Sequence, residues 1–182
     1  MERLAAAVAP APLVLDEAYA DFADENGIGL LTRVPNLIVT RSFSKAYSLA
    51  GIRFGYAVAD PAVVRELVKV KDSYNCDVLS LAAATAAVED QDYFREVRAK
   101  IVATRGRLAA ALAALGFEVT PSHANFLWCR RADRPVEPVY EELKRRKVLV
   151  RYMNYAGTDG LRVTVGTDAE TDRLLAELRS IL

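Results

Sequence analysis

The sequence predicts an α/β protein in two parts: residues 1–91, with helices on a mostly parallel sheet, and a small α+β domain over residues 92–182. Short, continuous apolar runs at residues 13–15 and 37–40 predict the first part, because such runs are typical of strands buried on both faces of a parallel sheet. After residue 91, amphipathic helical patterns alternate with short β-branched runs, which predicts the second part.

Proline and glycine residues separate the elements of the first part. We expect a helix over residues 1–9, strands over 13–15, 37–40 and 54–59, and helices over 61–71 and 77–89. Pro10 and Pro12 end the first helix, and Pro61 lies near the start of the next. Residues 23–35 carry acidic residues and two glycines, which predicts a loop with a short crossover helix. The helix at 77–89 is apolar nearly all round, so we expect it to be covered on most sides.

The second part begins with a long helix over residues 92–115, which Gly116 ends. We expect strands over residues 125–129, 149–152 and 161–165, and helices over 136–146 and 168–182. Thr167 or Asp168 is placed to cap the last helix through a side-chain oxygen. The basic residues 144–147 close a helix, where we expect them to be solvated and favourable to the helix dipole.

Composition narrows the class of partner. Lysine plus arginine and aspartate plus glutamate both number 24, so the net charge is zero and nothing favours nucleic acid or an anionic membrane. No apolar run reaches the roughly 20 residues that span a bilayer, and the start of the chain lacks a secretion signal, so we expect a cytoplasmic protein. Cys76 and Cys129 are too few for a metal or disulfide framework, and we expect both to be core residues.

A lysine between hydroxyl and guanidinium groups marks the segment at residues 40–56, TRSFSKAYSLAGIRFGY. An amine that attacks a carbonyl must be unprotonated part of the time, and an electropositive, partly buried setting favours this by lowering its pKa. We expect Arg41 and Arg53 to supply that setting for Lys45. Ser42, Ser44 and Arg53 can all donate hydrogen bonds to a phosphate. The segment therefore predicts an anion site beside a reactive amine.

Three segments resemble, in the same order, the pyridoxal-phosphate-dependent aminotransferases of fold type I, and among them the histidinol-phosphate aminotransferases. Residues 40–56 resemble the family's lysine signature, residues 13–22 its aspartate-bearing strand end, and residues 160–167 its C-terminal arginine motif. The resemblance implies pyridoxal 5'-phosphate as cofactor. It also implies that residues 1–91 are part of the family's large domain and that residues 92–182 are its small domain.

The resemblance also assigns the site residues. Lys45 would be the catalytic residue, first as covalent anchor of the cofactor and then as general base. Asp16 would keep the ring nitrogen of the cofactor protonated, because a neighbouring carboxylate raises the pKa of that nitrogen. Tyr19 would hydrogen-bond the phenolate oxygen of the ring. The cofactor phosphate would be bound by Ser42, Ser44 and Arg53.

Two arginines in the second part are candidates for substrate binding. Arg162 lies in an apolar, β-branched run, where a buried guanidinium needs an anionic partner. The resemblance assigns it the substrate carboxylate, which the planar fork of arginine suits. Arg151 resembles the residue that contacts the substrate phosphate, although a strand-end charge in solvent stays an equal alternative. His123, the only histidine, is expected to be a turn residue.

The implied reaction transfers an amino group between histidinol phosphate and 2-oxoglutarate, a step of histidine biosynthesis. The same scaffold leaves open a threonine-phosphate decarboxylase and an aromatic or aspartate aminotransferase. Because the chain resembles only the second half of these enzymes, we expect a truncated protein whose site lacks the family's N-terminal residues. A non-catalytic fragment that associates without cofactor also stays open. An uncovered sheet edge and apolar face would favour a homodimer or higher homo-oligomer.

Overall fold

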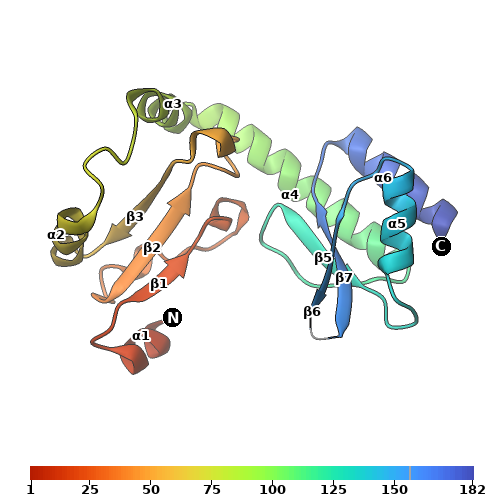
Figure 1. The fold of residues 1–182 in the computed structure, drawn as a ribbon, viewed down its shortest axis with the longest axis horizontal. Helices are drawn as coiled ribbons and strands as arrows, with labels where there is room; N and C mark the ends of the chain where they lie inside the picture. The colour runs from red at the N-terminus through yellow and green to blue at the C-terminus, as the bar shows by residue number, and fades with distance from the viewer. Residues whose placement is uncertain (156) are drawn as a thin grey trace. The chain divides into compact units, whose positions relative to one another are not determined.

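The computed structural model of the chain describes residues 1–155 and 157–182. These residues form two compact units, Met1–Glu96 and Val97–Leu182, each with its own sheet (Figure 1). The mixed α/β class that the sequence predicts is confirmed, whereas the domain boundary after residue 91 stays a prediction. Within the described residues, no helix has both the length and the apolar character needed to cross a membrane.

The first unit contains a three-stranded sheet in the order β1-β2-β3 (Figure 1). Strands β1 (Leu13–Asp16) and β2 (Leu37–Ser42) are parallel, and their register pairs Asp16 with Thr40. Strand β3 (Gly55–Ala59) pairs with β2 in the antiparallel sense. The carboxyl ends of β1 and β2 therefore meet at one edge of the sheet, as the sequence predicts.

The two faces of this sheet differ in burial. Side chains alternate between the faces of a strand, so Leu15 and Val39 share the face that packs on the core. That core also contains Ala5 and Val34 from the segments before each strand. On the opposite face, Val14 is 57% exposed. The expectation of burial on both faces is therefore wrong for β1 but correct for β2, because Ile38, which pairs with Val14, is only 8% exposed.

Short helices complete the first unit. They are α1 (Glu2–Val8), the 3-10 helices η1 (Ala20–Phe22), η2 (Ile28–Leu30) and η3 (Ala50–Ile52), and the α-helices α2 (Pro61–Val70) and α3 (Val78–Glu89). The Asp77 carboxylate caps α3 by accepting hydrogen bonds from the N–H groups of Leu79 and Ser80. We expected α3 to be covered on most sides, but Leu79 is 78% exposed and the buried residues of the helix are Ser80 and Ala84.

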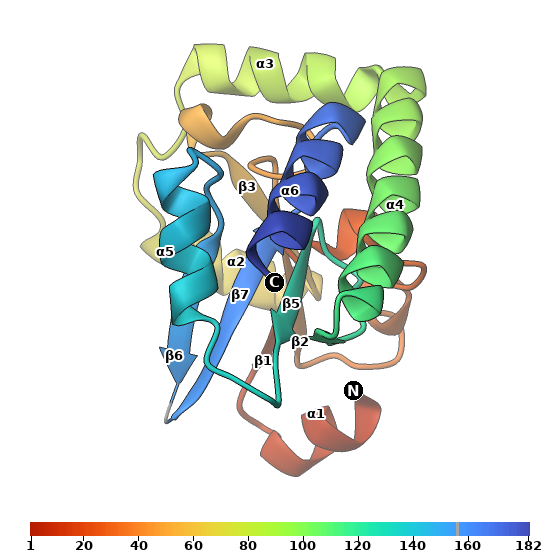
Figure 2. The ribbon, with the colours of Figure 1, turned by 90° about the vertical axis from the view of Figure 1, so that its right-hand side faces the viewer.

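Helix α4 (Gln91–Ala114) begins in the first unit and continues into the second. The second unit has an antiparallel sheet in the order β4-β5-β7-β6. Its strands are β4 (Glu118–Val119), β5 (Phe126–Arg130), β6 (Arg151–Tyr155) and β7 (Thr158–Thr164). Helices α5 (Glu137–Arg145) and α6 (Asp168–Ile181) lie over one face of this sheet (Figure 2).

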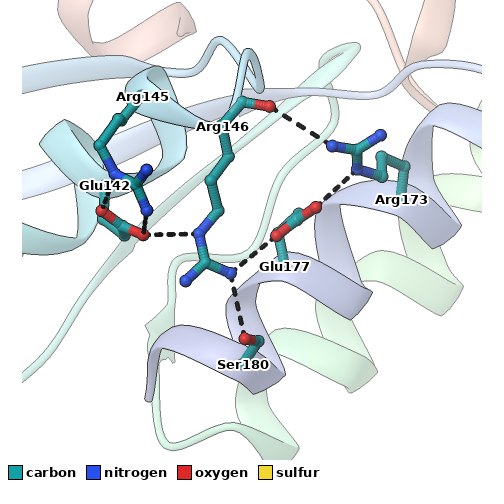
Figure 3. Close-up of polar contacts among 6 residues, drawn as sticks. All are labelled: Glu142, Arg145, Arg146, Arg173, Glu177 and Ser180. Atoms are coloured by element: carbon teal, nitrogen blue, oxygen red, sulfur yellow. Dashed lines mark hydrogen bonds and ion pairs between the residues drawn. The ribbon is translucent and has the colours of Figure 1, made fainter.

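Side chains cap the start of α6 and connect this helix to α5. Thr167 caps α6 in a capping box with Glu170, so the predicted cap is confirmed. Arg146, at the end of α5, donates hydrogen bonds to Glu142 and to Glu177 of α6 (Figure 3). The prediction that the basic residues 144–147 are only solvated is therefore wrong for Arg146, which joins two helices.

Candidate functional site

Asp16 ends β1 on the open face of the first sheet. It lies on the same face as Val14, and its side chain is exposed. One carboxylate oxygen accepts a hydrogen bond from the backbone N–H of Ala18 at 3.0 Å. This bond closes a turn that fixes the carboxylate at the strand end. An exposed, oriented carboxylate can accept a further hydrogen bond from a ligand on that face.

Lys45 and Tyr19 are in contact just beyond the ends of β2 and β1. The Lys45 Nζ atom lies 5.3 Å from the centroid of the Tyr19 ring, and both side chains are half-buried. A cation over an aromatic face is attracted by the ring quadrupole. Two residues far apart in sequence are thus brought together at the sheet edge that also carries Asp16. This is the position where ligands bind in open α/β sheets.

Hydroxyl groups before Lys45 and a guanidinium group after it in the sequence lie near the turn that carries this lysine. The Ser42 Oγ atom accepts a hydrogen bond from the Ser44 N–H at 3.1 Å. Arg53 donates to the carbonyl oxygen of Ala50 at 2.9 Å, and its Nη1 atom is 3.5 Å from Ser44 Oγ. The hydroxyls of Ser42 and Ser44 and the Arg53 guanidinium, nine residues after Ser44, form a donor set that fits a phosphate monoester.

Arg41 does not contribute to the positive setting that we expected for Lys45. Its guanidinium donates to the Glu17 carboxylate at 2.8 Å and to the Asp21 carboxylate at 2.9 Å. The Arg41 side chain is only 9% exposed and the Glu17 side chain 8%. Because two carboxylates neutralise one guanidinium, Arg53 is left as the arginine that can serve an anion here. The expectation for Arg41 is therefore corrected.

Sequence reasoning missed this buried ion network altogether. Glu17 directly follows Asp16, and Asp21 lies four residues further on. Both belong to the segment that resembles the family, in which only Asp16 and Tyr19 were given a role. An arginine within the apolar strand β2 was the available signal, because a guanidinium buried in a sheet requires anionic partners.

An aromatic cluster packs beneath the lysine turn. The Tyr47 ring stacks on Phe94 and also contacts Phe43, with 4.8 Å between the ring centroids in each pair. Burial raises the pKa of the Tyr47 hydroxyl above its ordinary value of 10, despite a hydrogen bond with Gln91 that acts in the opposite direction. Tyr47 therefore stays neutral and supports the turn by packing.

The second unit holds Arg151 and Arg162 on neighbouring strands. Arg162 of β7 pairs in register with Arg151 of β6 on one side and with Trp128 of β5 on the other. The Arg162 guanidinium lies over the Phe126 ring, 5.1 Å from its centroid. Among the described residues, its buried Nε atom has no hydrogen-bond partner. An unpartnered buried donor beside a second arginine is a site that an anion can complete.

The remaining candidates have structural positions. His123 is exposed, and the turn around it is closed by Ser122, which accepts a hydrogen bond from the Ala124 N–H. Cys129 is buried as expected, but the expectation for Cys76 is wrong because it is exposed. Across residues 1–155 and 157–182, His, Cys, Asp and Glu side chains form no group of three or more that could hold a metal ion.

Comparisons with known proteins give a consistent picture. A family model described as aminotransferase class I and II matches residues 1–178. Histidinol-phosphate aminotransferase from Rhodopirellula baltica is 54% identical over 162 residues, which are 88% of this chain and 45% of that protein. The crystal structure of histidinol-phosphate aminotransferase from Sinorhizobium meliloti in complex with pyridoxal-5'-phosphate is 33% identical, with a TM-score of 0.82 over 94% of this chain and 50% of that one.

The fold is also shared with enzymes of other reactions. The crystal structure of L-threonine-O-3-phosphate decarboxylase from Porphyromonas gingivalis covers 98% of this chain and 57% of its own, with a TM-score of 0.80 at 24% identity. That likeness shows the fold alone. The chain spans about half the length of the curated relatives that it matches.

Proposed function

Because the chain belongs to the class I and II aminotransferase family, we propose that it carries the lysine-bearing part of an aminotransferase that depends on pyridoxal 5'-phosphate. The proposed reaction transfers an amino group between histidinol phosphate and 2-oxoglutarate, in histidine biosynthesis. The observation that carries this proposal is the contact of Lys45 with Tyr19 at the ends of β1 and β2, next to the donor set of Ser42, Ser44 and Arg53.

Each residue of the lysine site has a proposed task. Lys45 would hold the cofactor through Nζ and then act as general base toward the substrate proton. Asp16 would accept a hydrogen bond from the protonated ring nitrogen, and Tyr19 would hydrogen-bond the phenolate oxygen. The phosphate would be bound by Ser42, Ser44 and Arg53. When bound, pyridoxal phosphate supplies an electron sink for the charge left on the substrate carbon after proton removal.

The second-unit arginines support an anionic substrate. Arg162 has a buried Nε atom that a carboxylate would satisfy, and a planar guanidinium suits a carboxylate. Arg151, opposite it in the sheet, would bind the phosphate of histidinol phosphate or the second carboxylate of 2-oxoglutarate. The names of the relatives favour histidinol phosphate as the amino donor.

Substrate assays distinguish the related enzymes. The chain, with cofactor added, is expected to form glutamate from 2-oxoglutarate with histidinol phosphate, in preference to aspartate or an aromatic amino acid. Release of carbon dioxide from threonine phosphate would instead favour the decarboxylase. Arg151→Met should raise KM for histidinol phosphate about tenfold or more, because one phosphate contact is lost. An unchanged KM would remove Arg151 from the substrate site.

We also propose that the chain is cytoplasmic and forms a homodimer or higher homo-oligomer through the exposed apolar side of α3. Val78 and Leu79 are large apolar side chains that are mostly exposed on this helix, and such surfaces favour association. Leu79→Glu is expected to lower the mass measured by light scattering, whereas Ala62→Glu, exposed on α2, should leave it unchanged. A monomeric wild-type chain would contradict this proposal.

A further inference from the structure

Adjacent residues at the ends of β1 and β2 lie on opposite faces of the first sheet. Asp16 extends the exposed side that contains Val14, whereas Glu17 is buried on the side of Leu15. Strand β2 alternates in the same way, so Ser42 and Arg41 are on opposite faces. Two of the proposed cofactor ligands, Asp16 and Ser42, therefore occupy one face, and the ion network lies on the other.

The network joins the two strand ends through side chains. The last backbone bond between these ends runs from the Glu17 N–H to the Thr40 carbonyl oxygen at 2.9 Å. Beyond it, the Arg41 guanidinium connects β2 to Glu17 and to Asp21, which lies in η1. Both Glu17 oxygens are used, because the second accepts a hydrogen bond from the Gly27 N–H.

Gly27 allows this arrangement because no larger residue fits. A Cβ atom there would meet a Leu15 methyl group at 2.5 Å and the Glu17 carboxylate at 3.1 Å. The loop after η1 therefore returns close enough to fix Glu17 from behind. A buried carboxylate with all its acceptors occupied has little freedom to move.

We propose that Arg41, Glu17 and Asp21 are positioning residues for the cofactor site: they hold the turn of Asp16 and the turn of Ser42–Lys45 at a fixed separation. This inference rests on the proposed function. None of the three would touch cofactor or substrate, since each is on the covered side of the strand ends or in η1. Their effect reaches the site through the backbone, one residue away from Asp16 and from Ser42.

Two backbone amides report the geometry of the turns without any cofactor. The Ala18 N–H donates to the Asp16 carboxylate, and the Ser44 N–H donates to Ser42 Oγ. Two reference amides lie at the far ends of the same strands: the Leu13 N–H donates to the Asn36 carbonyl oxygen, and the Leu37 N–H to that of Val34. Exchange with solvent measures how often each bond opens.

The test compares amide exchange by NMR in the wild-type chain and three variants. Glu17→Gln removes the charge but keeps an oxygen that can accept the hydrogen bond from the Gly27 N–H. Asp21→Asn also removes a charge, but it affects only the bond from Arg41 to η1. Arg33→Met is the matched control, because Arg33 forms an exposed ion pair with Glu2 in the same unit. Exchange at Ala18 and Ser44 should rise about tenfold or more in Glu17→Gln, because the loss of a residue that supports a ligand site typically has an effect of this size. The rise should be smaller in Asp21→Asn.

The reference amides at Leu13 and Leu37 should keep their rates, and Arg33→Met should change none of the four. Unchanged exchange at Ala18 and Ser44 overturns the inference. An equal rise at all four amides in both Glu17→Gln and Asp21→Asn also overturns it, because the network would then support only the fold.

Cofactor binding provides the second readout. The dissociation constant for pyridoxal phosphate, from titration of the visible absorption band, should rise about tenfold or more in Glu17→Gln and stay constant in Arg33→Met. Equal binding by the wild type and Glu17→Gln overturns the inference but leaves the proposed function standing. If the wild type binds no cofactor, the proposed function fails, and the exchange pattern alone still decides whether the network positions the turns.

Discussion

Arg151 of β6 and Arg162 of β7 lie directly opposite each other in the antiparallel sheet of the second unit. Opposite residues of such a pair have side chains on the same face, and like charges there are unfavourable. The core side chains Leu161 and Val163 alternate with Arg162, so the two arginines are on the face away from the core. The pair is thus held in an arrangement that a bound anion would stabilise.

Replacing Arg162 should therefore make the empty chain more stable. Arg162→Met keeps the alkyl stem but removes the like-charge pair and the buried Nε atom, so the free energy of unfolding should rise by ~1 kcal/mol. Urea denaturation in low salt measures it. Arg130→Met, which breaks an exposed pair with Glu118, should change the free energy by less than about 1 kcal/mol.

Added phosphate provides the complementary measurement. It should stabilise the wild type, because a ligand that binds only the folded state raises its stability, and should have a smaller effect on Arg162→Met. A lower stability of Arg162→Met, together with equal phosphate effects, would exclude an anion site at these two arginines.

The two cysteines should differ in reactivity. Burial raises the pKa of the Cys129 thiol to about 12, whereas Cys76 is exposed. Because only the thiolate reacts, a thiol reagent at mildly alkaline pH should label Cys76 quickly and Cys129 only after unfolding. Cys76→Ser should abolish labelling of the native chain, and rapid labelling of that variant would contradict the buried position of Cys129.

The ion pairs at the end of α5 should weaken in acid. Hydrogen bonds from Arg145, which has the larger effect, and from Arg146 lower the pKa of the Glu142 carboxyl from 4.5 to about 2 (Figure 3). A folded-state pKa below the unfolded value stabilises the protein above pH 4.5, and this stabilisation is lost as the pH falls toward about 2.

Unfolding free energies measured between these pH values check the prediction. Glu142→Gln should show a weaker dependence on pH than the wild type. Glu141→Gln, on the exposed side of the same helix, is the control and should retain most of the wild-type dependence. Identical pH profiles for the wild type and Glu142→Gln would refute the prediction.

Gly160 should be intolerant of alanine. A Cβ atom at this position of β7 would collide with the Trp128 ring, whereas one at Gly106 of α4 would meet nothing within 4 Å. Gly160→Ala should therefore lower the free energy of unfolding by about 1–3 kcal/mol. Gly106→Ala should raise it by roughly 0.5–1 kcal/mol, because alanine favours a helix interior. Trp128 is the only tryptophan, so its fluorescence should shift only in Gly160→Ala.

Local sequence signals predicted the elements and several of their ends. Thr167 was expected to cap α6 and does so, because a cap depends only on residues close in sequence. The strand expected at residues 149–152 occurs at Arg151–Tyr155 instead, and the two-residue strand β4 was missed. Those boundaries depend on which strands pair, which apolar runs do not specify.

The candidate site was predicted less fully. Asp16 was predicted from its place at the end of an apolar strand, Lys45 from the hydroxyl and guanidinium groups near it, and Tyr19 from the resemblance to a family; all three roles stay predictions. The partners of Arg41 were missed because Glu17 and Asp21 are 24 and 20 residues away in sequence. The burial of α3 was also overestimated. An apolar helix predicts burial, but its sequence does not specify which surface packs against it.

The covalent attachment of pyridoxal phosphate tests the proposed function most directly. The chain is mixed with pyridoxal phosphate, reduced with borohydride, digested and examined by mass spectrometry, alongside Lys45→Ala and Lys69→Ala. Lys69 is an exposed lysine paired with Glu66 in the same unit, so its replacement should change nothing. The proposal predicts one label on the peptide of Lys45, lost only in Lys45→Ala. An unlabelled chain, or a label spread equally over surface lysines, would contradict it.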